Sequence, residues 1–239
     1  MGRAYEVRKA SIQKTGAAKA KLYSMYAREI YQAAKNGGTS LESNIPLKRL
    51  VDKAHGDQVP SDIIKRAIDK VNSGTDESYD SVRYELFGPG GSTVIVDCLT
   101  DNVNRSVSNI RAALNKTNSK MGSMGSASYN YDNLCIFSFK GMNEEEVFNA
   151  LLEKGIEIED IETDEENVIV YGRPSDFYEI KETILGLTSN ITFDMAEISM
   201  LPKDTITLQG EDLEYFQKLL TMLDEIEDVQ HVYHNVELS

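Results

Sequence analysis

The stretch from residue 83 to residue 105 reads RYELFGPGGSTVIVDCLTDNVNR and sets the pattern of the fold. Apolar and β-branched residues in 83–87 and 93–99 predict two strands, and the glycine- and proline-rich segment 88–91 predicts a hairpin turn between them. A helix is expected to follow over 103–114, because its apolar residues recur at spacings of four, three and four.

Downstream of this unit, strand and helix patterns alternate in a specific order. After a Gly/Ser-rich loop (119–126) and a predicted strand at 127–131, the segment 134–200 gives strand, helix, strand, strand, helix, strand. The corresponding ranges are 134–140, 143–154, 157–162, 167–172, 175–187 and 194–200. This order predicts a ferredoxin-like domain with two helices on an antiparallel sheet. A last helix (212–224) and strand (229–236) are expected to pack on the 80–132 unit.

Upstream, the first third of the chain reads as helix. The predicted helices cover 15–36, 46–55 and 60–73, which makes a small bundle. The expected fold class is therefore α+β, an N-terminal three-helix bundle followed by two α/β sandwich-like domains, one of them the ferredoxin-like insertion. The predicted domains are 1–77, 78–133 plus 203–239, and 134–202.

Charge is distributed unevenly along the chain, whose net charge is −14. Residues 1–70 hold 14 Lys/Arg and 7 Asp/Glu, whereas residues 71–239 hold 11 Lys/Arg and 32 Asp/Glu. Such asymmetry indicates an end that faces a polyanion. The alternative is a solvated charged surface without a ligand.

Four cations in the first third are spaced by seven residues: Lys14, Lys21, Arg28 and Lys35. On one straight helix such a row drifts by only ~20° per step, and it lies roughly 140° from the apolar stripe. Because like charges repel, we expect an anion opposite this row. The predicted nucleic-acid-binding residues are Arg3, Arg8, Lys9, Lys14, Lys19, Lys21, Arg28 and Lys35. Tyr5, Tyr23 and Tyr31 either stack on bases or pack half-buried in the fold.

A second set of polar and glycine residues is a further candidate contact: Gly88, Gly90, Gly91, Asn102, Asn104 and Arg105. Glycines allow backbone amides to approach a phosphate, but the loop has no Walker A pattern. The alternative is a tight turn followed by an ordinary helix start.

Signatures of catalysis are scarce. The chain has three histidines, and His231 and His234 are expected on opposite faces of one strand. We therefore predict no catalytic residue, no metal site, no cofactor and no enzymatic activity. Cys98 and Cys135 lie in apolar runs and are expected to be buried and reduced. No apolar segment is long enough for a membrane span, and a cytoplasmic protein is expected.

Residues 83–105, together with 122–129, 28–34 and 60–68, closely resemble the signature of the YebC/PmpR family. The opening Met1-Gly2-Arg3-Ala4 departs from the more common Gly-His-Ser-Lys-Trp and is similar to the YeeN-like branch. The resemblance implies a three-domain fold and one of two activities. Some members are described as DNA-binding transcriptional regulators, and others as translation factors that act at the ribosome.

Three functions therefore remain open. The first is a DNA-binding regulator, the second a factor that binds ribosomal or messenger RNA and associates with the ribosome, and the third an acidic protein-interaction scaffold. The combination of a compact basic part with an acidic body slightly favours RNA over DNA as the partner. The sequence specifies no oligomeric state. If the basic row binds nucleic acid, changing Lys14, Lys21 and Arg28 to Glu should abolish binding and leave the fold intact.

Overall fold

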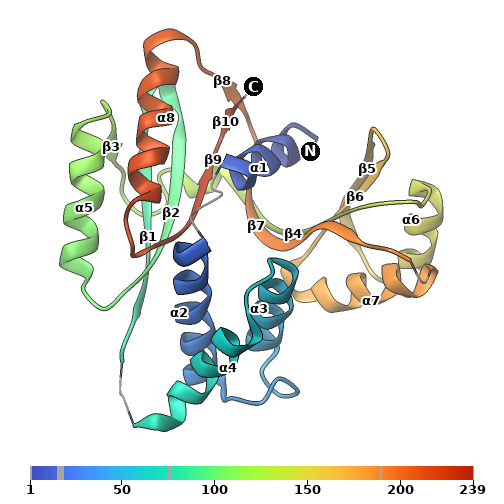
Figure 1. The fold of residues 1–239 in the computed structure, drawn as a ribbon. Coiled ribbons are helices and arrows are strands. Elements are labelled where there is room, and N and C mark those ends of the chain that lie inside the picture. Colours follow the sequence, from blue (N-terminus) through green and yellow to red (C-terminus); the bar gives the residue numbers. More distant parts are fainter. Residues whose placement is uncertain (1, 15–18, 75–76, 189, 239) are drawn as a thin grey trace. The chain divides into compact units, whose positions relative to one another are not determined.

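The computed structural model describes residues 2–14, 19–74, 77–188 and 190–238, without the side chains of 11–14. The chain divides into two compact units, and their elements are labelled in Figure 1. Residues 1–10, 128–206 and 235–239 form the ferredoxin-like unit, and residues 11–127 and 207–234 form the bundle–sheet unit. The α+β class is confirmed, whereas the predicted boundaries of three domains stay a prediction.

The bundle–sheet unit begins with the predicted bundle. Its elements are α2 (Lys19–Gly37), α3 (Ile45–Gly56), α4 (Ser61–Asp69) and the 3-10 turn η1 (Lys70–Ser73). The buried core of the bundle consists of Tyr26, Ile30, Ala34, Leu47, Val51, Ala54, Val59, Ile64 and Ala67. Asn44 caps α3, because its side-chain oxygen accepts the Leu47 N–H at 3.1 Å.

A four-stranded sheet in the order β3-β1-β2-β9 completes this unit. Its elements are β1 (Asp80–Phe87), β2 (Thr93–Thr100), α5 (Val103–Asn115), β3 (Lys120–Met121), α8 (Gly210–Asp224) and β9 (Val229–His234). The hairpin β1–β2 is antiparallel, with Tyr84 opposite Val96. Strand β9 pairs antiparallel with β2, so the C-terminal helix and strand return to the sheet that the 83–105 stretch begins.

The ferredoxin-like unit has the predicted βαββαβ order. Its elements are β4 (Tyr131–Lys140), α6 (Glu144–Glu153), β5 (Ile158–Asp164), β6 (Asn167–Gly172), α7 (Phe177–Leu187) and β7 (Phe193–Pro202), with the 3-10 turn η4 (Pro174–Asp176) before α7. The antiparallel sheet has the order β5-β6-β4-β7. Phe137 and Phe139 on β4 pack with Leu151 of α6 and Ile180 of α7 in one core, so both helices cover the same face.

The opposite face of that sheet is covered by α1 (Gly2–Lys14), a helix that the sequence patterns did not predict. Ala4 and Tyr5 of α1 are buried with Ile136, Ile169 and other residues of the sheet, and the Tyr5 hydroxyl lies 2.9 Å from the Ser138 hydroxyl. Strand β4 is consequently buried on both faces, which explains its nearly continuous apolar sequence.

Two local predictions are wrong. Residues 128–130 form a 3-10 turn (η3, Ser128–Asn130) instead of a strand, and β4 starts at Tyr131. The C-terminal strand is also divided: β9 ends at His234, and a separate two-residue strand, β10 (Val236–Glu237), pairs with β8 (Ile206–Thr207). Both buried cysteines are free thiols, as expected, and burial raises the pKa of Cys98 to about 12.

Candidate nucleic-acid interface

The eight predicted contact cations do not belong to one unit. Arg3, Arg8 and Lys9 are in the ferredoxin-like unit, whereas the α2 residues Lys19, Lys21, Arg28 and Lys35 are in the bundle–sheet unit. The side chain of Lys14 lies outside the described residues. The four-residue row was predicted on one helix, but Lys14 ends α1 and only three members lie on α2.

On α1, the cations differ sharply in exposure. Arg8 is 9% exposed, and its Nε donates to Glu197 Oε1 at 2.6 Å inside the unit. Its guanidinium therefore helps to hold α1 on the sheet. Arg3 is exposed and 3.9 Å from Glu237, and Lys9 lies 3.8 Å from Glu6.

The basic row on α2 faces carboxylates and carbonyls of the chain itself. Lys21 Nζ lies 2.8 Å from Asp224 at the end of α8, and Arg28 forms an ion pair with Glu227 in the turn between α8 and β9. Lys35 Nζ donates to the Glu77 carbonyl at 2.7 Å. The anion expected opposite the row is thus present for Lys21 and Arg28 within the protein itself.

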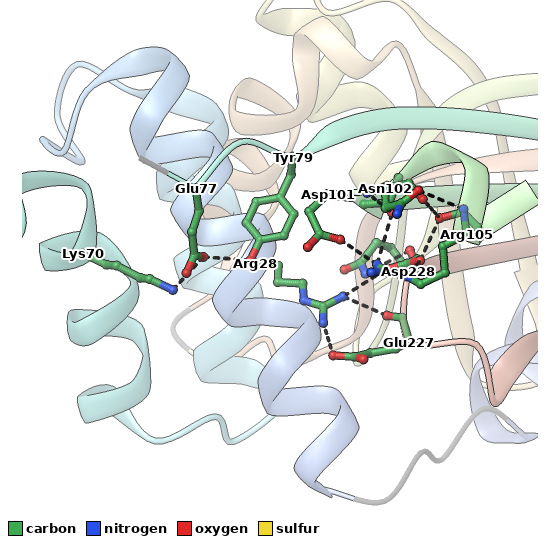
Figure 2. Close-up of polar contacts among 12 residues, drawn as sticks. Arg28, Lys70, Glu77, Tyr79, Asp101, Asn102, Arg105, Glu227 and Asp228 are labelled. Atoms are coloured by element: carbon green, nitrogen blue, oxygen red, sulfur yellow. Dashed lines mark hydrogen bonds and ion pairs between the residues drawn. The ribbon is translucent and has the colours of Figure 1, made fainter. Parts of the chain in front are cut away.

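Asp228 is the centre of this polar network (Figure 2). Its carboxylate accepts Arg105 Nη2 at 2.6 Å and the Ser106 hydroxyl at 2.7 Å, and Arg28 Nη1 lies 3.7 Å away. Burial acts to raise the pKa of the Asp228 carboxyl, but these hydrogen bonds outweigh burial and hold that pKa below its ordinary value. The network connects α2 with α5 and the start of β9.

The second predicted contact set has local structural roles. Asn102 caps α5 by accepting the Arg105 N–H at 3.0 Å, and Arg105 forms ion pairs with Asp101 and Asp228. Asn104 is exposed on the first turn of α5.

The glycines of that set shape a tight turn. The 3-10 turn η2 (Pro89–Gly91) has positive φ angles at Gly90 (62°) and Gly91 (81°), which glycine adopts without strain. A Cβ on Gly90 would come within 2.5 Å of Leu208, and one on Gly88 within 2.4 Å of the Ser92 hydroxyl. Close packing therefore explains Gly88 and Gly90, whereas the positive φ alone explains Gly91.

A pocket of about 330 Å³ lies between α2 and α4 in the bundle–sheet unit. Arg28 and Tyr31 line it from α2, Arg66 and Lys70 from α4 and η1, and Tyr79 from the segment before β1. Tyr31 and Tyr79 contact each other edge to face, with ring centroids 6.1 Å apart. Of these residues, only Arg28 and Tyr31 were singled out from the sequence.

The other pocket residues gave a weak signal in the sequence. Ile63, Arg66, Ala67 and Lys70 have the i, i+3, i+4, i+7 spacing of one helical face. Two of these four residues, Ile63 and Ala67, are apolar, and apolar residues at helical spacing indicate a core face more readily than a binding site. Tyr5 and Tyr31, two of the three tyrosines named for stacking, are buried, at 1% and 3% exposure.

Glu77 lines the pocket, and Figure 2 shows it beside Lys70 and Tyr79. Its carboxylate lies 2.7 Å from Lys70 Nζ and accepts the Tyr79 hydroxyl at 2.8 Å. The two hydrogen bonds lower the pKa of Glu77. Burial, together with the hydrogen bond to Glu77, raises the pKa of Tyr79 to about 12.

The protein is thus of the mixed α+β class. It has a basic helical bundle, a four-stranded sheet whose strands come from separate parts of the sequence, and an acidic ferredoxin-like unit. The TACO1/YebC protein N-terminal domain matches residues 3–74, and the TACO1/YebC second and third domain matches residues 79–236. The chain belongs to this family, which confirms the predicted family.

Relatives match over their full length. Probable transcriptional regulatory proteins of Marinobacter nauticus and Vibrio campbellii are 44% and 45% identical over 238 residues, which is 100% of this chain and 99% and 100% of theirs. The crystal structure of a conserved hypothetical protein from Aquifex aeolicus superimposes with a TM-score of 0.77 at 32% identity, over 93% of this chain and 92% of that chain.

The described residues include neither a metal-binding cluster nor a membrane-spanning helix. No group of three or more His, Cys, Asp or Glu side chains in this part of the chain could hold a metal ion. Among its helices, none is both long enough and apolar enough to cross a membrane.

Proposed function

We infer that this protein is a non-enzymatic regulator of gene expression that binds nucleic acid through the helices α2, α3 and α4. The observation that carries this function is the contrast in charge between parts of the chain. Residues 19–74 hold ten Lys/Arg and six Asp/Glu, whereas residues 128–206 hold five Lys/Arg and 18 Asp/Glu. A polyanion is attracted to the first part and repelled by the second.

The exposed cations of the bundle are the best candidates for phosphate contacts. Lys19 at the start of α2, Lys48 in the first turn of α3, and Arg66 on α4 are all exposed. Lys21 and Arg28 are less suitable, because they stabilise the fold through Asp224, Glu227 and Asp228. This assignment moves the proposed contact from the heptad-spaced row to the exposed ends and outer faces of the helices.

The names of the relatives support transcription, and therefore DNA, as the setting of this function. The pocket with its two tyrosines favours an unpaired base instead, as RNA or melted DNA presents it. We keep nucleic acid as the proposed partner and treat duplex DNA and single-stranded RNA as separate arms of the test.

A paired set of charge reversals tests the proposed surface. Lys19→Glu and Lys48→Glu each place a carboxylate in the first turn of a helix, where the helix dipole favours it, so the fold should be retained. The matched control is Lys140→Glu with Lys154→Glu, two exposed positions of the ferredoxin-like unit. Both double variants change the net charge equally.

Binding is measured by fluorescence anisotropy with labelled duplex DNA and single-stranded RNA over a range of salt concentrations. We expect the Lys19/Lys48 variant to bind about tenfold more weakly and to lose roughly one to two units of salt slope, since each lost phosphate contact removes about one. The control should lose much less. Equal losses of affinity in both variants would show that the contact lies elsewhere. A wild-type protein that binds neither probe would contradict nucleic-acid binding and favour the protein-interaction scaffold.

A further inference from the structure

The pocket between α2 and α4 is built from matching faces of two helices. Ser24, Ala27, Arg28 and Tyr31 of α2 have the i, i+3, i+4, i+7 spacing, and so do the four α4 and η1 residues that face them. Ser24, Ala27 and Ala67 are small, so the space between the helices stays open at this level. The walls therefore come from the longer side chains.

Two of these walls combine an aromatic ring with a cation. Lys70 Nζ lies 5.6 Å from the centre of the Tyr31 ring, and the Arg28 guanidinium carbon lies 6.0 Å from the centre of the Tyr79 ring. These distances are within the range of cation–π contacts. A planar, electron-rich group that enters the pocket would meet both ring and guanidinium surfaces.

The charge of the lining favours an anion. Three cations, Arg28, Arg66 and Lys70, line the pocket against one carboxylate, Glu77. Arg28 is paired with Glu227 outside the lining and Lys70 with Glu77, so Arg66 is the main candidate for an anion contact. Arg66 is the most accessible of the three, because its side chain is 71% exposed and its ion pair with Asp62 joins two exposed residues of one helix. Such a pair contributes little to stability, so Arg66 can exchange its carboxylate partner for a phosphate at small cost.

The size of the pocket limits the occupant. A volume of about 330 Å³ is at the lower end of the range for ligand sites and suits one nucleotide, but not a dinucleotide cofactor. Aromatic rings beside arginine are also the combination on which unpaired bases stack.

We propose that this pocket holds one nucleotide unit, with its base against Tyr79 and its phosphate on Arg66 and Lys70. The proposal rests on the proposed nucleic-acid function and specifies which part of a strand is recognised. The unit comes either from an unpaired position of a strand or from a free nucleotide.

Two neighbouring residues of α4 provide the test. Arg66→Gln and Lys65→Gln each remove one positive charge from an exposed position of the same helix, but only Arg66 lines the pocket. The probe is a labelled single-stranded RNA of about ten nucleotides, which is within the range that one single-strand-binding domain covers. A duplex of the same sequence is the second probe.

We expect Arg66→Gln to weaken single-strand binding about tenfold and Lys65→Gln only about twofold, with a smaller difference on the duplex. Tyr79→Leu should weaken single-strand binding at least about fivefold through lost stacking, and Tyr79→Phe, which keeps the ring, should weaken it less than Tyr79→Leu. Thermal unfolding of each variant shows whether the fold is retained.

Competition experiments distinguish the two sources of the nucleotide. If a nucleoside monophosphate displaces the RNA from the wild-type protein and inorganic phosphate at the same concentration does not, a free nucleotide is sufficient. If neither displaces it while the Arg66 effect holds, the nucleotide is recognised as part of a strand.

Equal losses in Arg66→Gln and Lys65→Gln, or displacement by inorganic phosphate as effective as by the nucleotide, would overturn the pocket proposal. Binding that remains steeply salt-dependent in that case leaves the proposed function intact. A wild-type protein without affinity for either probe contradicts the proposed function itself.

Discussion

At the scale of single residues, buried carboxylates organise the bundle–sheet unit. Glu85 is 4% exposed and accepts the backbone N–H groups of Gly125 and Ala127 at 2.7 and 2.6 Å, which fixes the Gly/Ser-rich loop. Glu29 accepts His231 Nε2 at 2.8 Å, and this contact lowers the pKa of Glu29 despite its burial. Asp228 likewise connects α2, α5 and the start of β9 through its contacts with Arg28, Arg105 and Ser106.

Asp228 should make the stability of this unit depend on pH. Its pKa is lower in the folded protein than the ordinary value of about 3.9. The stabilisation is therefore fully present above about pH 4 and is lost as the pH falls through the lower, folded-state pKa. We expect Asp228→Asn to lower the free energy of unfolding by about 2 kcal/mol at pH 7, because it removes the buried carboxylate that Arg105 and Arg28 share. The two guanidinium groups then keep only their more exposed partners, Asp101 and Glu227.

Urea unfolding of the wild type and Asp228→Asn between pH 7 and pH 2 measures this effect. The difference in unfolding free energy should stay constant down to about pH 4 and become smaller below it. A difference that does not change with pH would show that hydrogen-bond geometry, and not the charge of Asp228, is what stabilises the unit.

At the scale of elements, sequence patterns predicted those that repeat a clear period. Strand β6 was predicted at its observed bounds, and the helices α5 to α8 within a few residues, because each presents one apolar face or a fully buried run. Helix α1 was missed because its buried face includes Tyr5 and Arg8, whose burial depends on Ser138 and Glu197 more than a hundred residues away.

Dependence on residues far away in the sequence also limited the prediction of the candidate site. Three members of the predicted row lie together on α2. Their counter-charges Asp224 and Glu227 are about 200 residues distant in sequence, and no local pattern indicates that contact. The pocket was missed for a related reason, since Tyr79 and Glu77 reach it from the connection between the bundle and the sheet.

This arrangement changes what charge reversal on α2 should do. Arg28→Glu would place a carboxylate beside Glu227 and the 2%-exposed Asp228, so we expect a loss of about 2–3 kcal/mol in unfolding free energy. Lys19→Glu, on the same helix but exposed, should change stability by less than about 0.5 kcal/mol. The triple Lys14/Lys21/Arg28 reversal is therefore not expected to leave the fold intact.

Chemical denaturation of Arg28→Glu and Lys19→Glu separates the two effects. Equal and small losses would mean that the network around Asp228 contributes little, and the basic row would again be the first candidate for nucleic-acid contacts.

At the scale of the whole molecule, the chain order and the compact units do not coincide. The first ten residues belong to the ferredoxin-like unit, while the bundle that follows them in sequence belongs to the bundle–sheet unit. The most acidic part of the chain thus includes a helix from the basic end, and the Arg8–Glu197 pair, 10% and 5% exposed, is part of its interior.

Loss of that pair should weaken one unit and not the other. Arg8→Ala removes the guanidinium from the buried carboxylate of Glu197, and breaking a buried ion pair costs about 3 kcal/mol. Hydrogen exchange followed by mass spectrometry should show faster exchange in β4, β6 and β7, and unchanged exchange in α3 and α4. Arg3→Ala, at an exposed position of the same helix, is the matched control and should change neither. If Arg8→Ala instead raises exchange equally in both units, they unfold as one cooperative body, because a local loss spreads through a structure only when its parts share one unfolding transition.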